Sequence, residues 1–401
     1  MHIPFSPPDI TEAEIEEVVD ALRSGWITTG PKTKELEREL AEDLKTERVV
    51  LLNSATACLE MALRVLDIGE GDEVITSAYT YTASASVVAH VGARLVLVDT
   101  AEDSLEMDYD ALERAITEKT KAIIPVDVAG VPCDYDRLFA VVEEKRALFT
   151  PKNELGAALG RVAIVADAAH SLGAVYKGKP IGSVADMTSF STHAVKNFTT
   201  AEGGALTWTI PTDHDALYHE LMLLSLHGQS KDALAKTKLG AWEYDILMPG
   251  YKCNMTDVHA AIGLAQRRRY PALLKRRSEI VARYNEAFRG TRIRPLVHDR
   301  ADRTSSHHLY ITQIEGATDA MRRAVIEEMG ARGIACNVHY KPLPLLTAYH
   351  KMGFEIADYP NAMRHYENEV TLPLHTCLTD EEVAYIIKNY KEVTEWIFAQ
   401  A

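Results

Sequence analysis

Between residues 48 and 168, short runs of apolar and β-branched residues alternate with segments in which apolar residues recur at helical spacing. RVVLLN is followed by ATACLEMALRVL, and DEVITSA is followed by TASASVVAHVG. This alternation is typical of βαβ units, in which consecutive strands pair in parallel and helices cover both faces of the sheet. We therefore predict an α/β fold with a mostly parallel sheet.

Two domains are expected, because 401 residues exceed the usual size of a single domain. Residues 13–265 contain the alternation and are predicted to form a large α/β domain. Residues 266–401, joined by residues 1–12, are predicted to form a smaller α+β domain. In this second part, strand-like runs such as HHLYITQI again alternate with helical segments such as DAMRRAVIEEMGARG.

Capping residues predict where three of the helices begin. Thr11 with Glu14, and Thr379 with Glu382, have the spacing of a capping box at a helix N-terminus. Thr256 precedes a long helical segment that is expected to leave the first domain. We expect an interruption of this helix near Pro271, because proline removes a backbone hydrogen bond from a helix interior.

The composition argues against several classes of protein. A formal charge of −15 is unfavourable for a nucleic-acid-binding protein, which needs a basic surface for the phosphates. No basic segment followed by an apolar run opens the chain, and the most apolar stretch contains charged residues, so we predict neither a signal peptide nor a membrane span. The five cysteines are widely spaced and form no CxxC motif. We therefore expect no metal site, no disulfide framework and a cytoplasmic location.

Polar residues follow the predicted strands at the edge where open α/β sheets bind ligands. Taken singly, each of them has an ordinary structural explanation, such as helix capping, ring packing or a satisfied buried polar group. Lys196 alone would be read as a surface lysine. The residues concerned are those of the 54–57 turn, Tyr81, Asp167, His170 and Ser191, with Lys196 five residues beyond Ser191.

The combination of these residues favours pyridoxal phosphate as a cofactor. A carboxylate such as Asp167 can keep the ring nitrogen protonated, and a desolvated lysine such as Lys196 can bind the aldehyde covalently. The 54–57 turn opens a helix, whose free N–H groups form an anion site suited to the phosphate. An aromatic side chain, Tyr81, can stack on the ring.

Seven sequence segments identify a resemblance to a known family. The chain resembles, over essentially its whole length, the DegT/StrS-type sugar aminotransferases, a branch of the fold-type-I pyridoxal phosphate enzymes. The resemblance implies a large domain with a sheet of the seven-stranded type and a smaller C-terminal α+β domain. The segments are SGWITTGPKT (24–33), NSATACLEMAL (53–63), DEVITSAYTYTAS (72–84), ADAAHSLGA (166–174), HAVKNFTTAEGG (193–204), PGYKCNMTDVHAAIGLAQ (249–266) and VHYKPLP (338–344).

The resemblance also implies roles at the cofactor. Lys196 corresponds to the lysine that binds the cofactor covalently and moves protons, and Asp167 to the partner of the ring nitrogen. The other corresponding positions are Tyr81 for ring stacking, His170 for the 3-hydroxyl region, and Thr56, Ala57 and Ser191 for the phosphate. In the family, the asparagine at the position of Asn254 reaches the phosphate of the neighbouring subunit, so the resemblance implies a homodimer with shared active sites.

The reaction implied by the resemblance has two halves. Glutamate, as amino donor, converts pyridoxal phosphate to pyridoxamine phosphate, which then aminates a nucleotide-linked keto sugar, a 4-keto-6-deoxyhexose rather than a 3-keto sugar. Such products serve surface-glycan, polysaccharide or secondary-metabolite biosynthesis. Candidate contacts to the sugar or its diphosphate are Trp26, Thr28, Lys252, His308, His339 and Tyr340. The alternatives are a loop anchor for Trp26, a structural ion pair for Lys252, and packing or surface positions for the histidines.

Other functions remain open for the same framework. A cyclitol or related keto ring could replace the sugar as acceptor. A non-catalytic regulator that keeps the cofactor fold would predict loss of Lys196 or Asp167, and both are present. The chain departs from the common family pattern at Ala55, where a glycine is usual, at Thr192, where an aromatic residue is common, and at Asp127, where a histidine is frequent.

Overall fold

The computed structural model of the chain describes residues 1–230 and 243–400. Its main feature is a seven-stranded sheet with the strand order β1-β9-β8-β5-β4-β2-β3. The strands are β1 (Val49–Leu52), β2 (Glu73–Ser77), β3 (Arg94–Val98), β4 (Thr120–Ile124), β5 (Ala163–Asp167), β8 (Met187–Ser191) and β9 (Gly204–Trp208).

The sheet is mostly parallel, as the alternation of strands and helices predicts. β3, β2, β4, β5 and β8 pair in parallel, whereas β9 runs antiparallel to both of its neighbours, β8 and β1. The connection from β8 to β9, residues 192–203, contains Lys196. Because the parallel strands end at the same edge, the residues that follow them are brought together there.

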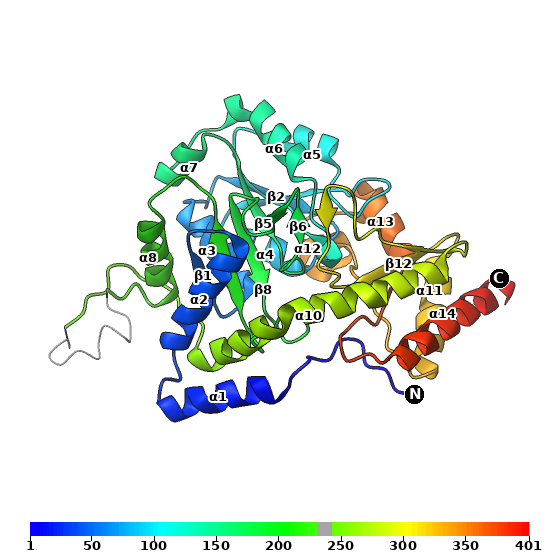
Figure 1. Ribbon diagram of the computed structural model, residues 1–401. Helices are drawn as coiled ribbons and strands as arrows, with labels where there is room; N and C mark the ends of the chain where they lie inside the picture. The colour runs from blue at the N-terminus through cyan, green and yellow to red at the C-terminus, as the bar shows by residue number, and fades with distance from the viewer. Residues whose placement is uncertain (231–242, 401) are drawn as a thin grey trace.

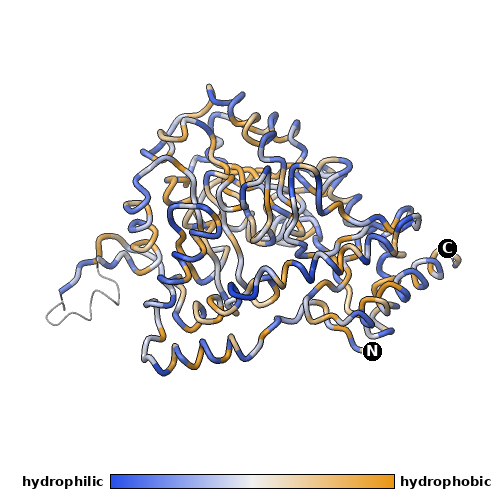
Figure 2. Tube along the Cα trace, in the orientation of Figure 1, coloured by the Kyte–Doolittle hydropathy of each residue, from blue (hydrophilic) through white to orange (hydrophobic). Residues whose placement is uncertain are grey.

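Helices cover both faces of this sheet, and apolar side chains fill the space between the layers (Figure 1). The strands form an apolar centre, whereas the surrounding helices carry alternating apolar and polar residues (Figure 2). One face packs against α3 (Ala55–Val65), α4 (Thr82–His90), α7 (Glu154–Leu159) and α8 (His214–Ser225). The other face packs against α2 (Pro31–Leu44), α5 (Tyr109–Ala115), α6 (Tyr135–Glu144) and the start of α10 (Asp257–Phe288).

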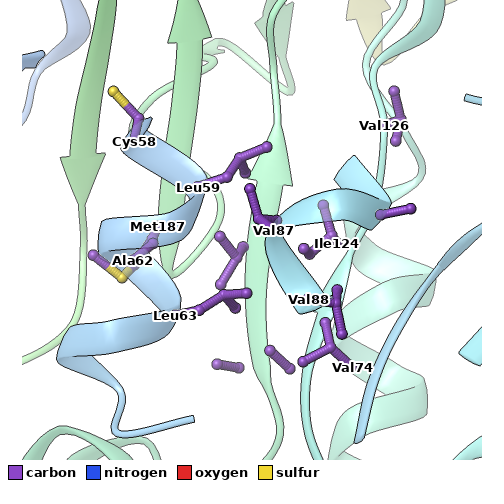
Figure 3. Close-up of a cluster of buried hydrophobic side chains, with 14 of the residues drawn as sticks. Cys58, Leu59, Ala62, Leu63, Val74, Val87, Val88, Ile124, Val126 and Met187 are labelled. Atoms are coloured by element: carbon purple, nitrogen blue, oxygen red, sulfur yellow. The ribbon is translucent and has the colours of Figure 1, made fainter. Parts of the chain in front are cut away.

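In the first of these layers, apolar side chains of α3 and α4 pack against the strands of the sheet (Figure 3). Leu59 and Leu63 of α3 lie one turn apart and are fully buried with Val87 of α4 against the strands. Fully burying one such side chain contributes about 1.5–3 kcal/mol, so this apolar stripe fixes α3 on the sheet. As a result, the N-terminus of α3 lies at the edge where the strands end.

The long helix α10 connects the main sheet to a second group of elements and lies beside α1 (Glu12–Ser24) (Figure 1). The predicted interruption near Pro271 is wrong, because α10 runs continuously through this proline. Proline removes one N–H from the helix ladder, but packing holds the helix on both sides. Leu264 is buried in the main domain's core and Ile280 in the core of the second group.

The second group of elements contains a three-stranded antiparallel sheet of order β10-β12-β13, packed against α11 and α14. The N-terminal residues join it, since Ile3 pairs with Ile334. The division of the chain at residues 265 and 266 stays a prediction. The elements are β10 (Ile293–Pro295), β12 (Tyr310–Ile314), β13 (Glu369–Leu372), α11 (Asp319–Ala331), α12 (Thr347–Lys351), α13 (Pro360–Glu367) and α14 (Asp380–Gln400).

The remaining elements are short. A small antiparallel sheet is formed by β6 (Val175–Tyr176), β7 (Lys179–Pro180) and β11 (Arg303–Thr304). Single 3₁₀ turns lie at Val128–Gly130, Arg146–Leu148, Leu343–Leu345 and Ile356–Asp358.

The predicted helix caps form at both ends of the chain. The backbone N–H of Thr11 donates to Glu14 at 2.7 Å, and that of Thr379 donates to Glu382 at 2.9 Å. Over residues 1–230 and 243–400, every helix is too short or too polar to cross a lipid bilayer.

Candidate active site

A cavity of about 380 Å³ lies at the edge of the main sheet where the parallel strands end. Its walls come from the segments that follow β1, β2, β5 and β8, and from residues 308–309 and 339–340 of the second group of elements. Lys196, Asp167 and His170 all line it. The fold therefore gathers side chains that are far apart in the sequence around a single ligand-sized space.

Asp167 ends β5 and is only 5% exposed. Its Oδ2 accepts a hydrogen bond from Ser84 Oγ at 2.6 Å, and its Oδ1 accepts one from the backbone N–H of Ala169 at 3.2 Å. Burial raises the pKa of the Asp167 carboxyl, whereas these two hydrogen bonds and the charge of Lys196 oppose the rise. A carboxylate in such a place favours a cationic partner in the cavity.

Lys196 extends into the same cavity from the connection between β8 and β9. Desolvation by burial lowers the pKa of its amine to about 8, while the attraction of Asp167 works in the opposite direction. No residue in the described part of the chain accepts a hydrogen bond from its Nζ. About a fifth of the amine is therefore neutral at pH 7.4, far more than for an ordinary lysine, and the neutral form is the one that acts as a nucleophile or a general base.

The tautomer of His170 follows from its two neighbours. The backbone N–H of Ala129 donates to Nδ1 at 3.2 Å, so Nδ1 carries no proton. Burial and the nearby charge of Lys196 lower the pKa of the imidazole well below its usual range, so the ring is neutral. The proton must lie on Nε2, which donates to Tyr340 Oη at 3.1 Å. The proton of the Tyr340 hydroxyl remains available to a ligand.

His308 forms a further part of the wall, with its ring centroid 4.3 Å from that of His170. Its Nδ1 lies 2.8 Å from Asn197 Oδ1, and the amide nitrogen of Asn197 donates to the Ser306 carbonyl at 2.7 Å. Because this second bond fixes the amide, Oδ1 faces the ring and His308 is the donor. Asn197, which directly follows Lys196 in the sequence, thus positions His308.

The turn at the start of α3, where the anion site is predicted, lies at the cavity. Ala55 and Thr56 line the cavity, but Ala57 does not, and the N–H of Ala57 donates to Ser54 Oγ at 3.1 Å. The glycine that the family usually has at residue 55 is unnecessary here, since Ala55 is the first residue of α3 and has no positive φ. The glycine that this turn requires is instead Gly204, the first residue of β9. A Cβ at residue 204 would lie 2.5 Å from the backbone nitrogen of Ala55, so only glycine lets β9 approach the turn this closely.

Other predicted cofactor contacts are also found at the cavity. Ser191 lines it at the end of β8. Tyr81 lines it and is 61% exposed, with its ring centroid 6.1 Å from that of Tyr340. A ring with one free face at the mouth of a cavity can stack on a planar ligand.

Besides Ala57, four predicted contacts do not line this cavity in the same chain: Trp26, Thr28, Lys252 and Asn254. The amide nitrogen of Asn254 donates to Thr29 Oγ1 at 2.6 Å, and its Oδ1 accepts from Lys252 Nζ. The Thr28 carbonyl accepts from the N–H of Asp257. Their part in a site formed with a second subunit stays a prediction.

Several residues at the site were not predicted from the sequence. Ser84 and Asn197 hold predicted site residues, and Phe5 and Ser6 bring the N-terminal segment into the cavity wall. Ser84 lies 83 residues before Asp167 and gives no signal of the contact; only its position one turn after Tyr81 in α4 places it near the strand ends.

The residues present fit pyridoxal phosphate. The buried Asp167 carboxylate suits a protonated ring nitrogen, the Lys196 amine suits the aldehyde, and the helix N-terminus at Thr56 suits the phosphate. No cluster of three or more metal-ligating side chains occurs in the parts of the chain with described coordinates. Fold and site together define a pyridoxal phosphate enzyme of fold type I.

Comparison with known proteins gives the family. Residues 8–391 match the model of the DegT/DnrJ/EryC1/StrS aminotransferase family, and the chain belongs to this family. It is therefore a pyridoxal-phosphate-dependent aminotransferase, and the predictions of family, fold class, enzyme class and cofactor are confirmed.

Individual relatives agree with this assignment over nearly the full length. The chain is 38% identical over 399 residues to the spore coat polysaccharide biosynthesis protein SpsC of Bacillus subtilis (strain 168), covering 98% of this chain and 97% of that protein. It is 62% identical to the PMP form of Spr1654 from Streptococcus pneumoniae, described as a putative sugar aminotransferase, with a TM-score of 0.97 and coverage of 99% and 100%. Helicobacter pylori PseC, an aminotransferase involved in the biosynthesis of pseudoaminic acid, is 27% identical with a TM-score of 0.86 and the same coverage.

Proposed function

We propose that this aminotransferase transfers the amino group of glutamate to a nucleotide-linked keto sugar, a 4-keto-6-deoxyhexose rather than a 3-keto sugar. The observation that carries the proposal is that the Lys196 amine and the buried Asp167 carboxylate line one cavity that has room for a substrate. The sugar is supported by relatives described as acting in sugar amination or polysaccharide biosynthesis. The nucleotide and the position of the keto group rest on the family resemblance.

The chain's own residues explain how a proton moves during such a reaction. When bound, pyridoxal phosphate supplies a ring that accepts the electron pair left behind when the amino-bearing carbon loses a proton. Lys196, with a pKa of about 8, can take that proton and return it to a neighbouring atom near neutral pH. Asp167 keeps the ring nitrogen protonated, and Ser84 holds the Asp167 carboxylate in place.

A homodimer with shared active sites is part of the proposal. Asn254 does not line the cavity of its own chain. Large apolar side chains are exposed at residues 244–251, just before Asn254, and at residue 27, and a subunit interface would cover them. These side chains are Ile27, Tyr244, Ile246, Leu247 and Tyr251. The location in the cytoplasm stays a prediction.

The proposal is tested with ¹⁵N-labelled glutamate and a panel of nucleotide-linked 4-keto and 3-keto sugars and keto cyclitols. We expect ¹⁵N to appear in an amino sugar with the wild-type enzyme and to be absent with Lys196→Ala, as read by mass spectrometry. Transfer only to a cyclitol, or only to a 3-keto sugar, would contradict the proposed acceptor. The purified enzyme should also show a visible absorption band that borohydride fixes and that Lys196→Ala abolishes.

A further inference from the structure

A chain of hydrogen bonds leads from a buried carboxyl group to the wall of the cavity. Glu369 begins β13 and is fully buried. Its Oε2 accepts from the backbone N–H of His339 at 2.8 Å, and its Oε1 is 2.5 Å from the Thr371 hydroxyl. The same hydroxyl lies 3.0 Å from His339 Nδ1. Glu369 and Thr371 are two residues apart and therefore point to the same side of the strand.

The imidazole of His339 is the end of this chain and lines the cavity. Its ring stacks on Phe5 with centroids 5.5 Å apart, and Nδ1 is held by Thr371. Nε2 has no hydrogen-bond partner within residues 1–230 and 243–400, so it is the ring nitrogen that a bound substrate can reach. Burial, and then the charge of Lys196, lower the pKa of His339 to about 3, so the ring is neutral and carries one proton.

The proton count of these groups permits two arrangements. If Glu369 is ionised, Thr371 donates to Oε1 and accepts from Nδ1–H, which leaves Nε2 of His339 as a bare acceptor. If Glu369 is protonated at Oε1, it donates to Thr371, Thr371 donates to Nδ1, and the ring proton lies on Nε2. Thr371 and the neutral ring of His339 each carry a single proton, so a change in the protonation of Glu369 reverses the direction of both hydrogen bonds together.

We propose that Glu369, acting through Thr371, sets which nitrogen of His339 carries the proton, and so decides whether Nε2 offers a donor or an acceptor to the substrate. Uptake of one proton at Nε2 is balanced along the chain. An Nε2–H bond forms, the Nδ1 proton passes to Thr371 Oγ1, and the original Thr371 proton passes to Glu369 Oε1. Three bonds to hydrogen form, two break, and the chain gains one proton in total.

The surroundings of Glu369 favour the protonated carboxyl at neutral pH. Burial raises its pKa to about 8, against the hydrogen bonds from Thr371 and His339 and the positive charge of Arg322 on α11. Below pH 8, Nε2 of His339 is therefore a donor, which suits an oxygen acceptor on the substrate, such as a carboxylate, carbonyl or hydroxyl group. The other titratable groups that interact with Glu369 are neutral there, because burial raises their pKa values: Tyr79, Cys336, Tyr340 and Tyr390.

The inference rests on the proposed function only for the substrate that Nε2 meets, because the tautomer itself can be measured without the acceptor sugar. The cofactor-loaded enzyme is labelled with ¹⁵N-histidine, and the His339 signals are assigned by their loss in His339→Gln. The ¹⁵N NMR chemical shifts of the imidazole distinguish a protonated from an unprotonated ring nitrogen. We expect the proton on Nε2 at pH 6.5 and on Nδ1 at pH 9.5 in the wild-type enzyme.

Two variants separate the relay from a purely structural role. Glu369→Gln keeps both hydrogen bonds but is always neutral, so its amide should donate to Thr371 and hold the ring proton on Nε2 at both pH values. Thr371→Val keeps the shape but removes the link, so the His339 tautomer should no longer change with pH. The exposed Glu381 at the start of α14 provides the matched control, and Glu381→Gln should behave as the wild type.

Kinetics of the glutamate half-reaction give a second readout. Above pH 8, where the wild type has lost the donor, its KM should be about three- to tenfold higher than that of Glu369→Gln at the same pH, with kcat within about twofold, as expected for one neutral hydrogen bond. Below pH 8 the KM values of the two proteins should agree, and the titration of Lys196 affects both proteins equally. A wild-type tautomer that does not change with pH, or one that still changes in Glu369→Gln, would overturn the inference without affecting the proposed acceptor. Failure to aminate any keto sugar would instead remove the proposed acceptor and leave the tautomer result intact.

Discussion

Tyr340 Oη lies 3.1 Å from His170 Nε2, and this contact joins the segment after β5 to the segment before the 3₁₀ turn Leu343–Leu345 across the cavity. The two residues are 170 positions apart in the sequence. Since Nδ1 of His170 is occupied by the Ala129 N–H, the tyrosine oxygen is the acceptor for the single proton of the ring. The contact therefore holds together the two groups of elements that form the site.

Removing this acceptor should weaken both the fold and the reaction. In Tyr340→Phe the buried Nε2–H of His170 has no acceptor, which costs about 1–3 kcal/mol. We expect the free energy of unfolding in urea to fall by about that amount and kcat/KM to fall about tenfold. Tyr359→Phe, at a buried tyrosine outside the cavity, serves as the control. Equal effects in both variants would show that the His170 contact is unimportant.

The hydrogen bond from Ser84 to Asp167 should set the acid limb of the pH profile. Ser84 Oγ donates to the carboxylate at 2.6 Å and holds the Asp167 pKa below the value that burial alone would give. A hydrogen bond to a charged group is worth about 1.5–3 kcal/mol, so Ser84→Ala should shift the acid limb of kcat/KM upward by about one to two pH units. Ser86→Ala, on the same helix but outside the cavity, should leave the profile unchanged.

Subunit mixing tests whether Asn254 serves the neighbouring active site. Lys196→Ala and Asn254→Ala enzymes should each have activity lowered by about tenfold or more, the first because the proton-moving amine is lost. If the sites are shared, mixed dimers contain one site with an intact Lys196 from one chain and an intact Asn254 from the other. We expect activity to return after the two variants are unfolded and refolded together. Mixtures that remain as inactive as their parents would contradict a shared site.

Asp127 should make the stability of the protein depend on pH. It is 1% exposed and accepts from Ser171 Oγ at 2.7 Å and from the Cys133 N–H at 2.9 Å. Burial raises its pKa to about 6, so the folded state binds more protons than the unfolded state between about pH 4 and pH 6, and stability falls as the pH rises through this window.

The measurement for Asp127 compares urea unfolding at pH 5 and pH 7.5. The Asp127 contribution to the fall in stability is about 1 kcal/mol between these pH values. Asp127→Asn stays neutral and can keep the hydrogen bond from the Cys133 N–H. Between pH 5 and pH 7.5 its free energy of unfolding should therefore fall by about 1 kcal/mol less than that of the wild type. Asp103→Asn, at an exposed position, is the control and should follow the wild type. An identical pH dependence in all three proteins would contradict a raised pKa for the buried Asp127 carboxyl group.

Local patterns were sufficient to predict the sheet, the caps at Thr11 and Thr379, and the residues at the strand ends. Parallel strands end at one edge, so Asp167, His170 and Ser191 had to lie near each other once the alternation was recognised. The predicted interruption at Pro271 was wrong because it rested on local sequence alone. A local rule predicts a break there, but burial of α10 on both sides of the proline outweighs the missing hydrogen bond.

The sequence by itself determined the fold class and the cofactor and predicted the pair Lys196 and Asp167, because these depend on periodicity and on the residues that follow the strands. Only the tertiary structure decided which groups form hydrogen bonds with Asp167 and with the other side chains of the cavity wall. Ser84 holds Asp167, Asn197 directs His308, and Glu369 connects through Thr371 to His339. A buried glutamate in NEVTLPLH has the same local pattern as an exposed one, since its burial depends on what packs over the strand. Contacts between distant segments set the burial and hydrogen bonds of these groups, and hence where their protons lie.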